Sequence, residues 1–260
     1  MKNTIRIISL LLALVICIGC FAACDKNGGN GDNVVEEVPQ SDNYVADVQI
    51  KFATNDDKMK AAVDAMSSNA TINVFGDNFD VYTSSKVNDN TATNKYTLVD
   101  GMLYYSASLS LGEHTVSENK KAEFAGADKE ELIADITSTV RIDAGDFYVV
   151  DMTQNGDKVT YICSDAFEEA KADVASLVAD RFAAIGATVA VSGIEYHLET
   201  EGERNVSSIL SCDYVITLGG VDYEITMRLY TTYDYDATVA VCAPENADGY
   251  VSVPYSEIIK

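Results

Sequence analysis

The sequence predicts an α+β fold in which a large, curved antiparallel sheet, shaped as a half-barrel, carries helices packed on its concave face. Three observations lead to this class. Turn dipeptides divide much of the chain into hairpins, the strands beside them alternate apolar and polar residues, and one long segment has apolar residues at helical spacing. Because each element has one apolar face, we expect the sheet and the helices to share a core.

The composition indicates an acidic, soluble folded part. The chain has 260 residues, of which 47% are hydrophobic, and a net charge of −23. Lys2 and Arg6 are the bases before Cys24 and no acid precedes it, so the remainder carries 16 bases against 41 acids, a net charge of −25. A surface of this sign repels phosphate backbones, which excludes nucleic acid as a partner.

The N-terminus has the pattern of an export signal. Two bases are followed by an uncharged stretch over residues 7–23, somewhat short for a spanning helix, and small residues then precede Cys24 in "FAAC". This segment resembles a bacterial lipoprotein signal, which implies cleavage after residue 23 and lipidation of Cys24. "CIGC" offers Cys20 as the alternative, and a retained membrane anchor is the other interpretation of the apolar stretch.

After the signal, a polar segment rich in Gly and Asn over residues 24–45 is predicted to be a flexible tether. Residues 46–260 would then form a single domain. The alternative is two tandem units, each a helix with four strands, at about 46–126 and 127–260. Continuity of the sheet across that boundary is the observation that separates the two arrangements.

Two hairpins have turns that fix their register. With Asp100-Gly101 as a two-residue turn, Tyr96 faces Tyr105, and one side of the following strand is apolar while the other is largely hydroxyl. With Gly219-Gly220 as the turn, the partners on the apolar face are Ile216 with Tyr223, Tyr214 with Ile225, Cys212 with Met227 and Leu210 with Leu229. A slip by one residue would bring charged side chains into the core.

Two other hairpins are predicted, together with shorter elements. Asn155-Gly156 as a turn would place Met152 opposite Val159, and a weaker hairpin surrounds Asp77-Asn78. Helical spacing and a glycine stop predict a long helix over 166–185. Shorter helices are predicted at 56–67 and 129–138, and further strands at 194–200, 139–143 and 239–243.

The sequence contains no established catalytic motif, so we predict neither an enzyme nor a metal or cofactor site. His114 and His197 are isolated in the sequence, and His197 falls on an acidic, solvent-facing side of its strand. Cys163 and Cys212 are predicted to lie on core faces, where burial leaves a thiol inert, and Cys242 remains as a third cysteine.

The order of the elements resembles the LolA-like superfamily of lipoprotein carriers, including the LppX-type lipoproteins. The resemblance rests on the lipobox, the tether, the "DGMLYYS" hairpin and the final strand "VDYEITMRLYTTYDY" before "ATVAVCAPENA". It covers most of residues 46–247 and is one of layout. It implies a half-barrel that holds acyl chains or another apolar ligand.

Two functions follow as expectations. In the first, an extracytoplasmic lipoprotein anchored to the cell membrane binds an apolar ligand, with Tyr214, Ile225, Met227 and Leu229 helping to line the site. The same four residues could instead pack against the long helix and leave no cavity. The alternative function is a structural or protein-interaction lipoprotein with a filled core, which would use an acidic face rich in Tyr (Tyr104, Tyr230 and residues 231–236). We expect a monomer in either case.

Overall fold

The computed structural model describes residues 43–87, 90–126, 129–137, 147–166, 168–183, 186–202, 204–237 and 239–259. Cys20, Cys24, the apolar stretch, nearly all of the tether and the predicted strand at 139–143 lie outside these residues. Among the described helices, none is long and apolar enough to span a bilayer.

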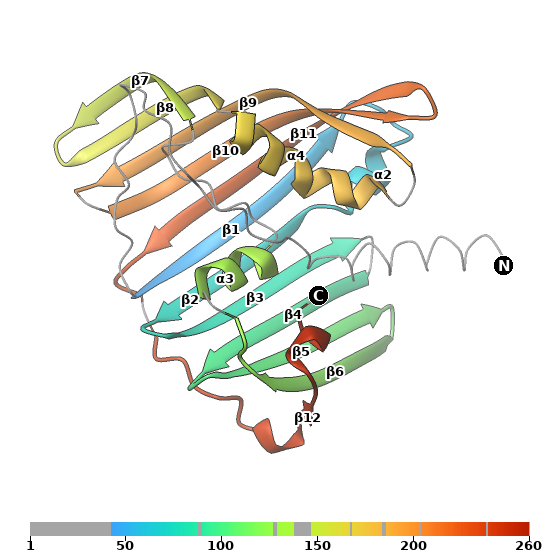
Figure 1. Ribbon diagram of the computed structural model, residues 1–260, viewed down its shortest axis with the longest axis vertical. Helices are drawn as coiled ribbons and strands as arrows, with labels where there is room; N and C mark the ends of the chain where they lie inside the picture. The colour runs from blue at the N-terminus through green and yellow to red at the C-terminus, as the bar shows by residue number, and fades with distance from the viewer. Residues whose placement is uncertain are drawn as a thin grey trace.

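The described residues form one twelve-stranded sheet in the order β12-β6-β5-β4-β3-β2-β1-β11-β10-β9-β8-β7 (Figure 1). Neighbouring strands are antiparallel, except for the parallel pair β12 and β6. The strands are β1 (Asn43–Thr54), β2 (Ser68–Phe75), β3 (Asn78–Val87), β4 (Asn90–Val99), β5 (Met102–Leu111), β6 (His114–Glu123), β7 (Phe147–Asn155), β8 (Lys158–Ala166), β9 (Thr188–Glu201), β10 (Arg204–Leu218), β11 (Val221–Asp234) and β12 (Val251–Ser252).

The α+β prediction is wrong, because the described chain is dominated by this open sheet. The α-helices are α2 (Lys60–Asp64), α3 (Lys129–Thr137) and α4 (Glu168–Ala183), with 5, 9 and 16 residues. Figure 1 shows them on one side of the sheet, where they cover only parts of it. The sequence interpretation overcounted helix at 56–67 and missed β1, whose buried residues alternate from Tyr44 to Phe52.

β1 lies in the middle of the sheet and pairs with both β2 and β11. The sheet therefore continues from the strands before residue 126 to those after it. Whether residues 46–260 fold as one unit stays a prediction.

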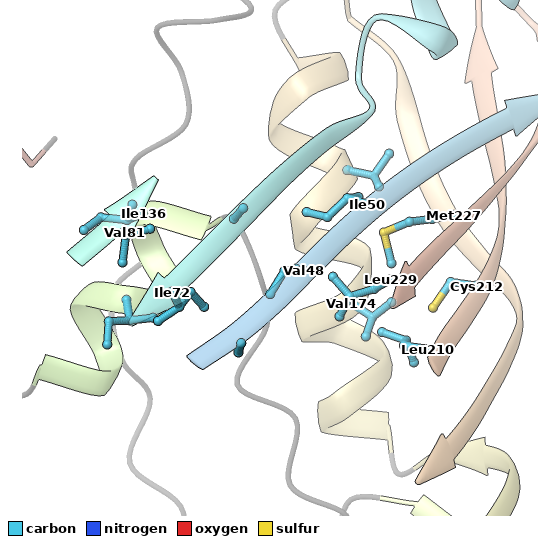
Figure 2. Packing of buried hydrophobic residues seen from close by; sticks show 14 of the residues in the cluster. Val48, Ile50, Ile72, Val81, Ile136, Val174, Leu210, Cys212, Met227 and Leu229 are labelled. Atoms are coloured by element: carbon cyan, nitrogen blue, oxygen red, sulfur yellow. The ribbon is translucent and has the colours of Figure 1, made fainter. Parts of the chain in front are cut away.

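The sheet has two faces with different chemistry. The inner face, on which the helices lie, carries the core, in which Val48 and Ile50 of β1 pack with Leu229 of β11 (Figure 2). The outer face carries the alternate residues of the same strands, such as Asp47 and Lys51. This alternation is the period-2 pattern of a sheet with one covered side.

Two predicted registers are confirmed. Leu98 pairs with Leu103 and Tyr96 with Tyr105, whose ring centroids are 4.9 Å apart. All four residue pairs predicted for β10 and β11 are present, from Ile216 with Tyr223 to Leu210 with Leu229.

The other two turns differ from the prediction by one residue. β7 and β8 turn at Gly156-Asp157, so that Met152 pairs with Tyr161 in place of Val159. β2 and β3 turn at Gly76-Asp77, where Gly76 has a φ of +59° that favours glycine.

The predicted strand at 239–243 is also wrong, because these residues begin an irregular C-terminal segment, which we name the strap (residues 239–259). The Asn73 side chain donates to the Val239 carbonyl on the outer face, and Lys121 donates to the Ala247 carbonyl, each at 2.9 Å. Through β12 the strap pairs with edge strand β6, and Ile258 then enters the core.

Candidate functional site

The four residues predicted to line a ligand site lie together in the core. Tyr214, Ile225 and Met227 are each 1% exposed, and Leu229 is 7% exposed. Their strands are brought together by the Gly219-Gly220 turn, and the alternation of β10 and β11 directs all four side chains to the inner face. The prediction thus identified residues that share one location.

Helix α4 fills the space in front of these residues. The Tyr214 hydroxyl donates to the backbone carbonyl of Val174 in α4 at 3.1 Å and lies 3.7 Å from the sulfur of Met227. Val174 and Val178 have no exposed surface, and Figure 2 shows Val174 beside Leu229 and Leu210. A ligand that touches Tyr214 would therefore have to displace α4.

A second part of the inner face is less well covered, where the end of β5 and the start of β6 meet at their turn. Val116 is 66% exposed and Leu111 is 38% exposed, while Leu109, the register partner of Val116, is half-buried. The alternation of Ala107, Leu109 and Leu111 signalled this surface in the sequence. That the helices stop short of it was not visible from any local pattern.

Polar side chains adjoin this apolar surface. The Tyr105 hydroxyl donates to the Asn94 side chain at 3.2 Å, and Lys120 lies 3.1 Å from Glu118. Burial, with a contribution from Glu118, raises the pKa of Tyr105 to about 12, and burial also raises the pKa of Tyr96. Both phenols therefore remain protonated at neutral pH and can act as donors.

Two of the three cysteines in the described ranges lie in the core. Cys163 and Cys212 are buried, Cys242 is exposed, and all three are free thiols. Burial raises the pKa of Cys212 to about 12 and that of Cys163 above its usual value. Since the thiolate is the nucleophile, the two buried thiols are held in their unreactive form.

His197 lies on the outer face and contacts the Glu195 carboxylate at 2.7 Å, as an exposed histidine with an acidic neighbour. Within the described ranges, no three His, Cys, Asp or Glu side chains gather in a way that could hold a metal ion.

The tyrosines predicted for a partner surface are divided between the two faces. Tyr230 and Tyr104 both lie on the outer face. The Lys51 ammonium is 5.3 Å from the centroid of the Tyr230 ring, and Tyr104 packs edge-on against Tyr250 of the strap. Tyr233 and Tyr235 pack instead against the core cluster, so residues 231–236 do not form one outer patch.

No family model matches the chain, and no curated protein matches it. Among solved structures, the dehydratase domain from the CurK module of curacin polyketide synthase is similar at 8% identity and a TM-score of 0.14, covering 76% of this chain and 78% of that chain. The dehydratase domain of the polyketide PpsC from Mycobacterium tuberculosis is similar at 9% identity and a TM-score of 0.15, covering 77% of each chain. Scores this low support no argument about fold or activity.

Proposed function

We propose that this chain is a membrane-anchored extracytoplasmic lipoprotein that is lipidated at Cys24 and acts by binding a partner, without catalysis. The observation that carries the proposal is that α4 fills the part of the inner face predicted to bind a ligand, where Tyr214 is bonded to α4 and the buried thiols lie in the core. The lipobox "FAAC" and the polar tether support the anchor, and the regular strands begin at Asn43. This choice favours the second of the two functions expected from the sequence.

Metabolic labelling tests the anchor. The full chain is expressed in bacteria that are fed a palmitate analogue bearing an alkyne, and the label is read on a gel alongside membrane fractionation. We expect Cys24→Ser to lose both the label and the processed, membrane-bound form of the protein. The matched variant Cys20→Ser should keep both. If only Cys20→Ser loses the label, the lipidated residue is Cys20. If the parent and both variants all remain unlabelled, the proposed lipidation is contradicted.

An apolar ligand is the second candidate function, favoured by the exposed residues Leu111 and Val116 beside the polar groups of Tyr105 and Glu118. An amphiphile has the matching division into an apolar tail and a polar head. In this candidate the ligand lies on the uncovered part of the inner face, away from the surface that α4 fills.

A fluorescence titration with cis-parinaric acid tests this candidate. The protein used for it begins at residue 25. Binding is expected to fall in Val116→Glu and to persist in Val251→Glu, which is a similarly exposed control at 63%. A loss in Met227→Ala without a loss in Val116→Glu would return the site to the four predicted residues beneath α4. If the purified protein carries no extractable lipid and does not bind cis-parinaric acid, this candidate function is contradicted.

A further inference from the structure

A straight row of hydroxyl side chains crosses the outer face of four neighbouring strands. Ser84 of β3 is the register partner of Thr93 in β4, Thr93 pairs with Ser108 in β5, and Ser108 pairs with Ser117 in β6. We name these four residues the hydroxyl row. Adjacent strands are about 4.8 Å apart, so the row presents a hydroxyl group at each such step.

The hydroxyl row has no partner within the described part of the chain. No side-chain hydrogen bond joins any of the four residues to another described residue, whereas the nearby Ser110 contacts Thr115 at 3.2 Å and Ser106 contacts Tyr250. Ser117 is exposed and the other three are half-buried. Each hydroxyl can donate one hydrogen bond and accept two, so the row has unused capacity of both kinds.

An open aromatic ring lies next to this row. Tyr82 is in β3, two residues before Ser84 and on the same face, and it is 46% exposed although β3 is an inner strand of the sheet. Its register neighbours are Thr71 in β2 and Lys95 in β4. The ring thus lies between polar side chains.

This part of the outer face departs from the acidic character of the chain. From Thr91 to Thr97 in β4, and at the positions paired with them in β5 and β6, the outward side chains include Lys95 and Lys121 and no carboxylate. Lys95 lies 3.4 Å from Asp80 of β3, and Lys121 is bonded to the strap. In a chain with 41 acids and 18 bases, this part of the outer face is therefore close to neutral.

We propose that the outer face of β3–β6 binds a neutral glycan strand. One sugar ring lies with its C–H face against Tyr82, and its neighbours exchange hydrogen bonds with the hydroxyl row. The charges nearest the hydroxyl row are engaged within the protein, Asp80 with Lys95 and Lys121 with the strap, which leaves a surface that suits an uncharged ligand rich in hydroxyl groups. An anionic membrane surface would require a cluster of free cationic side chains or an apolar patch, whereas Lys95 and Lys121 of this face are held by Asp80 and by the strap. This inference rests on the proposed function, since it names the class of partner.

Calorimetric titration with three neutral oligosaccharides, chitohexaose, cellohexaose and maltoheptaose, tests the proposal. The full chain is purified in a detergent without a sugar headgroup. We expect at least one probe to bind with a Kd below about 1 mM, and Tyr82→Ala to weaken that binding about tenfold. Thr93→Glu, which places a carboxylate in the middle of the hydroxyl row, should abolish it.

The matched control is Tyr148→Ala, at a tyrosine of similar exposure (49%) on edge strand β7, and it should bind like the parent. Absence of binding by all three probes, or equal binding by Tyr82→Ala and Thr93→Glu, would overturn the proposal. Sedimentation is measured in parallel, and a dimer that Tyr82→Ala disrupts, with no glycan bound, would assign the face to a second copy and overturn it too. Cys24→Ser is titrated alongside, so a failure of lipidation and a failure of glycan binding are recorded separately.

Discussion

Asp135 of α3 is a carboxyl group that the fold makes harder to ionise. Burial, followed by the charge of Glu131 one turn earlier, raises the pKa of Asp135 to about 6. The same two carboxylates, after burial, raise the pKa of Tyr255 in the strap, which places all three groups near one another. The folded environment therefore favours the protonated form of Asp135 more than the unfolded chain does.

The stability of the protein should depend on pH through this residue. Between about pH 4, the ordinary pKa of Asp, and about pH 6, the folded state binds more protons at Asp135 than the unfolded state does. Its contribution to the free energy of unfolding is therefore fully present below pH 4 and is lost as the pH rises through 6. The free energy of unfolding of Asp135→Asn, minus that of the parent, should therefore be more positive at pH 7 than at pH 4. Urea denaturation at both pH values measures this difference.

Glu131→Gln provides the companion measurement. Because the Glu131 charge contributes to the raised pKa, its removal should narrow the pH window of the effect without eliminating it. An Asp135→Asn variant whose stability difference from the parent is the same at pH 4 and pH 7 would show that Asp135 titrates alike in both states.

At the scale of elements, the hairpin of β10 and β11 holds the surface against which α4 packs. Its two-residue turn has Gly219 at a φ of +60° and Gly220 at +80°. Two such residues suit the right-handed twist of the flanking strands, and side chains with a branched Cβ are strained there.

Gly220→Val should therefore lower the free energy of unfolding by about 1–2 kcal/mol or more, measured by chemical denaturation. Gly249→Ala is the matched control, because an added Cβ at Gly249 meets nothing within 4 Å and no positive φ opposes it. The control is expected to stay within about 0.5 kcal/mol of the parent. Equal effects of the two substitutions would mean that the turn geometry is not the source of the cost.

The turns also show how far the sequence could predict this fold. Asp-Gly and Gly-Gly dipeptides gave the correct registers, since both residues of those turns accept a positive φ. For β7 and β8 the pairing opposite Met152 changed by two positions, from Val159 to Tyr161, and these two residues lie on the same side of β8. Apolar alternation repeats every two residues, so it could not detect that change.

The candidate site was predictable to the same degree. Alternation placed Tyr214, Ile225, Met227 and Leu229 on one face, and helical spacing predicted α4. Whether α4 would cover those residues depends on the path of the connections, which local patterns do not encode. For the same reason the surface around Val116 and the hydroxyl row were not predicted as sites.

At the scale of the whole molecule, the strap ties the edge of the sheet to its core. It contacts the outer face at Asn73 and Lys121, pairs with β6 at its edge, and buries Ile258 among the inner-face residues. A segment with little regular structure of its own therefore contacts both faces and one edge.

Ile258→Ala should test how much this attachment contributes. A buried Ile→Ala change costs about 2–5 kcal/mol, and we expect the lower part of that range because Ile258 lies near the end of the chain. Val251→Ala, at a strap residue that is 63% exposed, is the control and should remain within about 0.5 kcal/mol of the parent in the same thermal or urea measurement. Equal stability of both variants and the parent would show that the strap is not coupled to global unfolding.

The central position of β1 has a consequence for how the chain reaches this structure. β1 is the earliest described strand to be synthesised, yet one of its two neighbours, β11, lies roughly 170 to 190 positions later. The hairpins of β2–β6 and of β7–β11 can form from local pairings, but the seam between β1 and β11 closes a loop that contains most of the folded part. Until β11 pairs with β1, a nascent chain exposes an unpaired edge on β1, and the incomplete protein is prone to aggregation. Synthesis of β11 is therefore the step that removes this exposed edge.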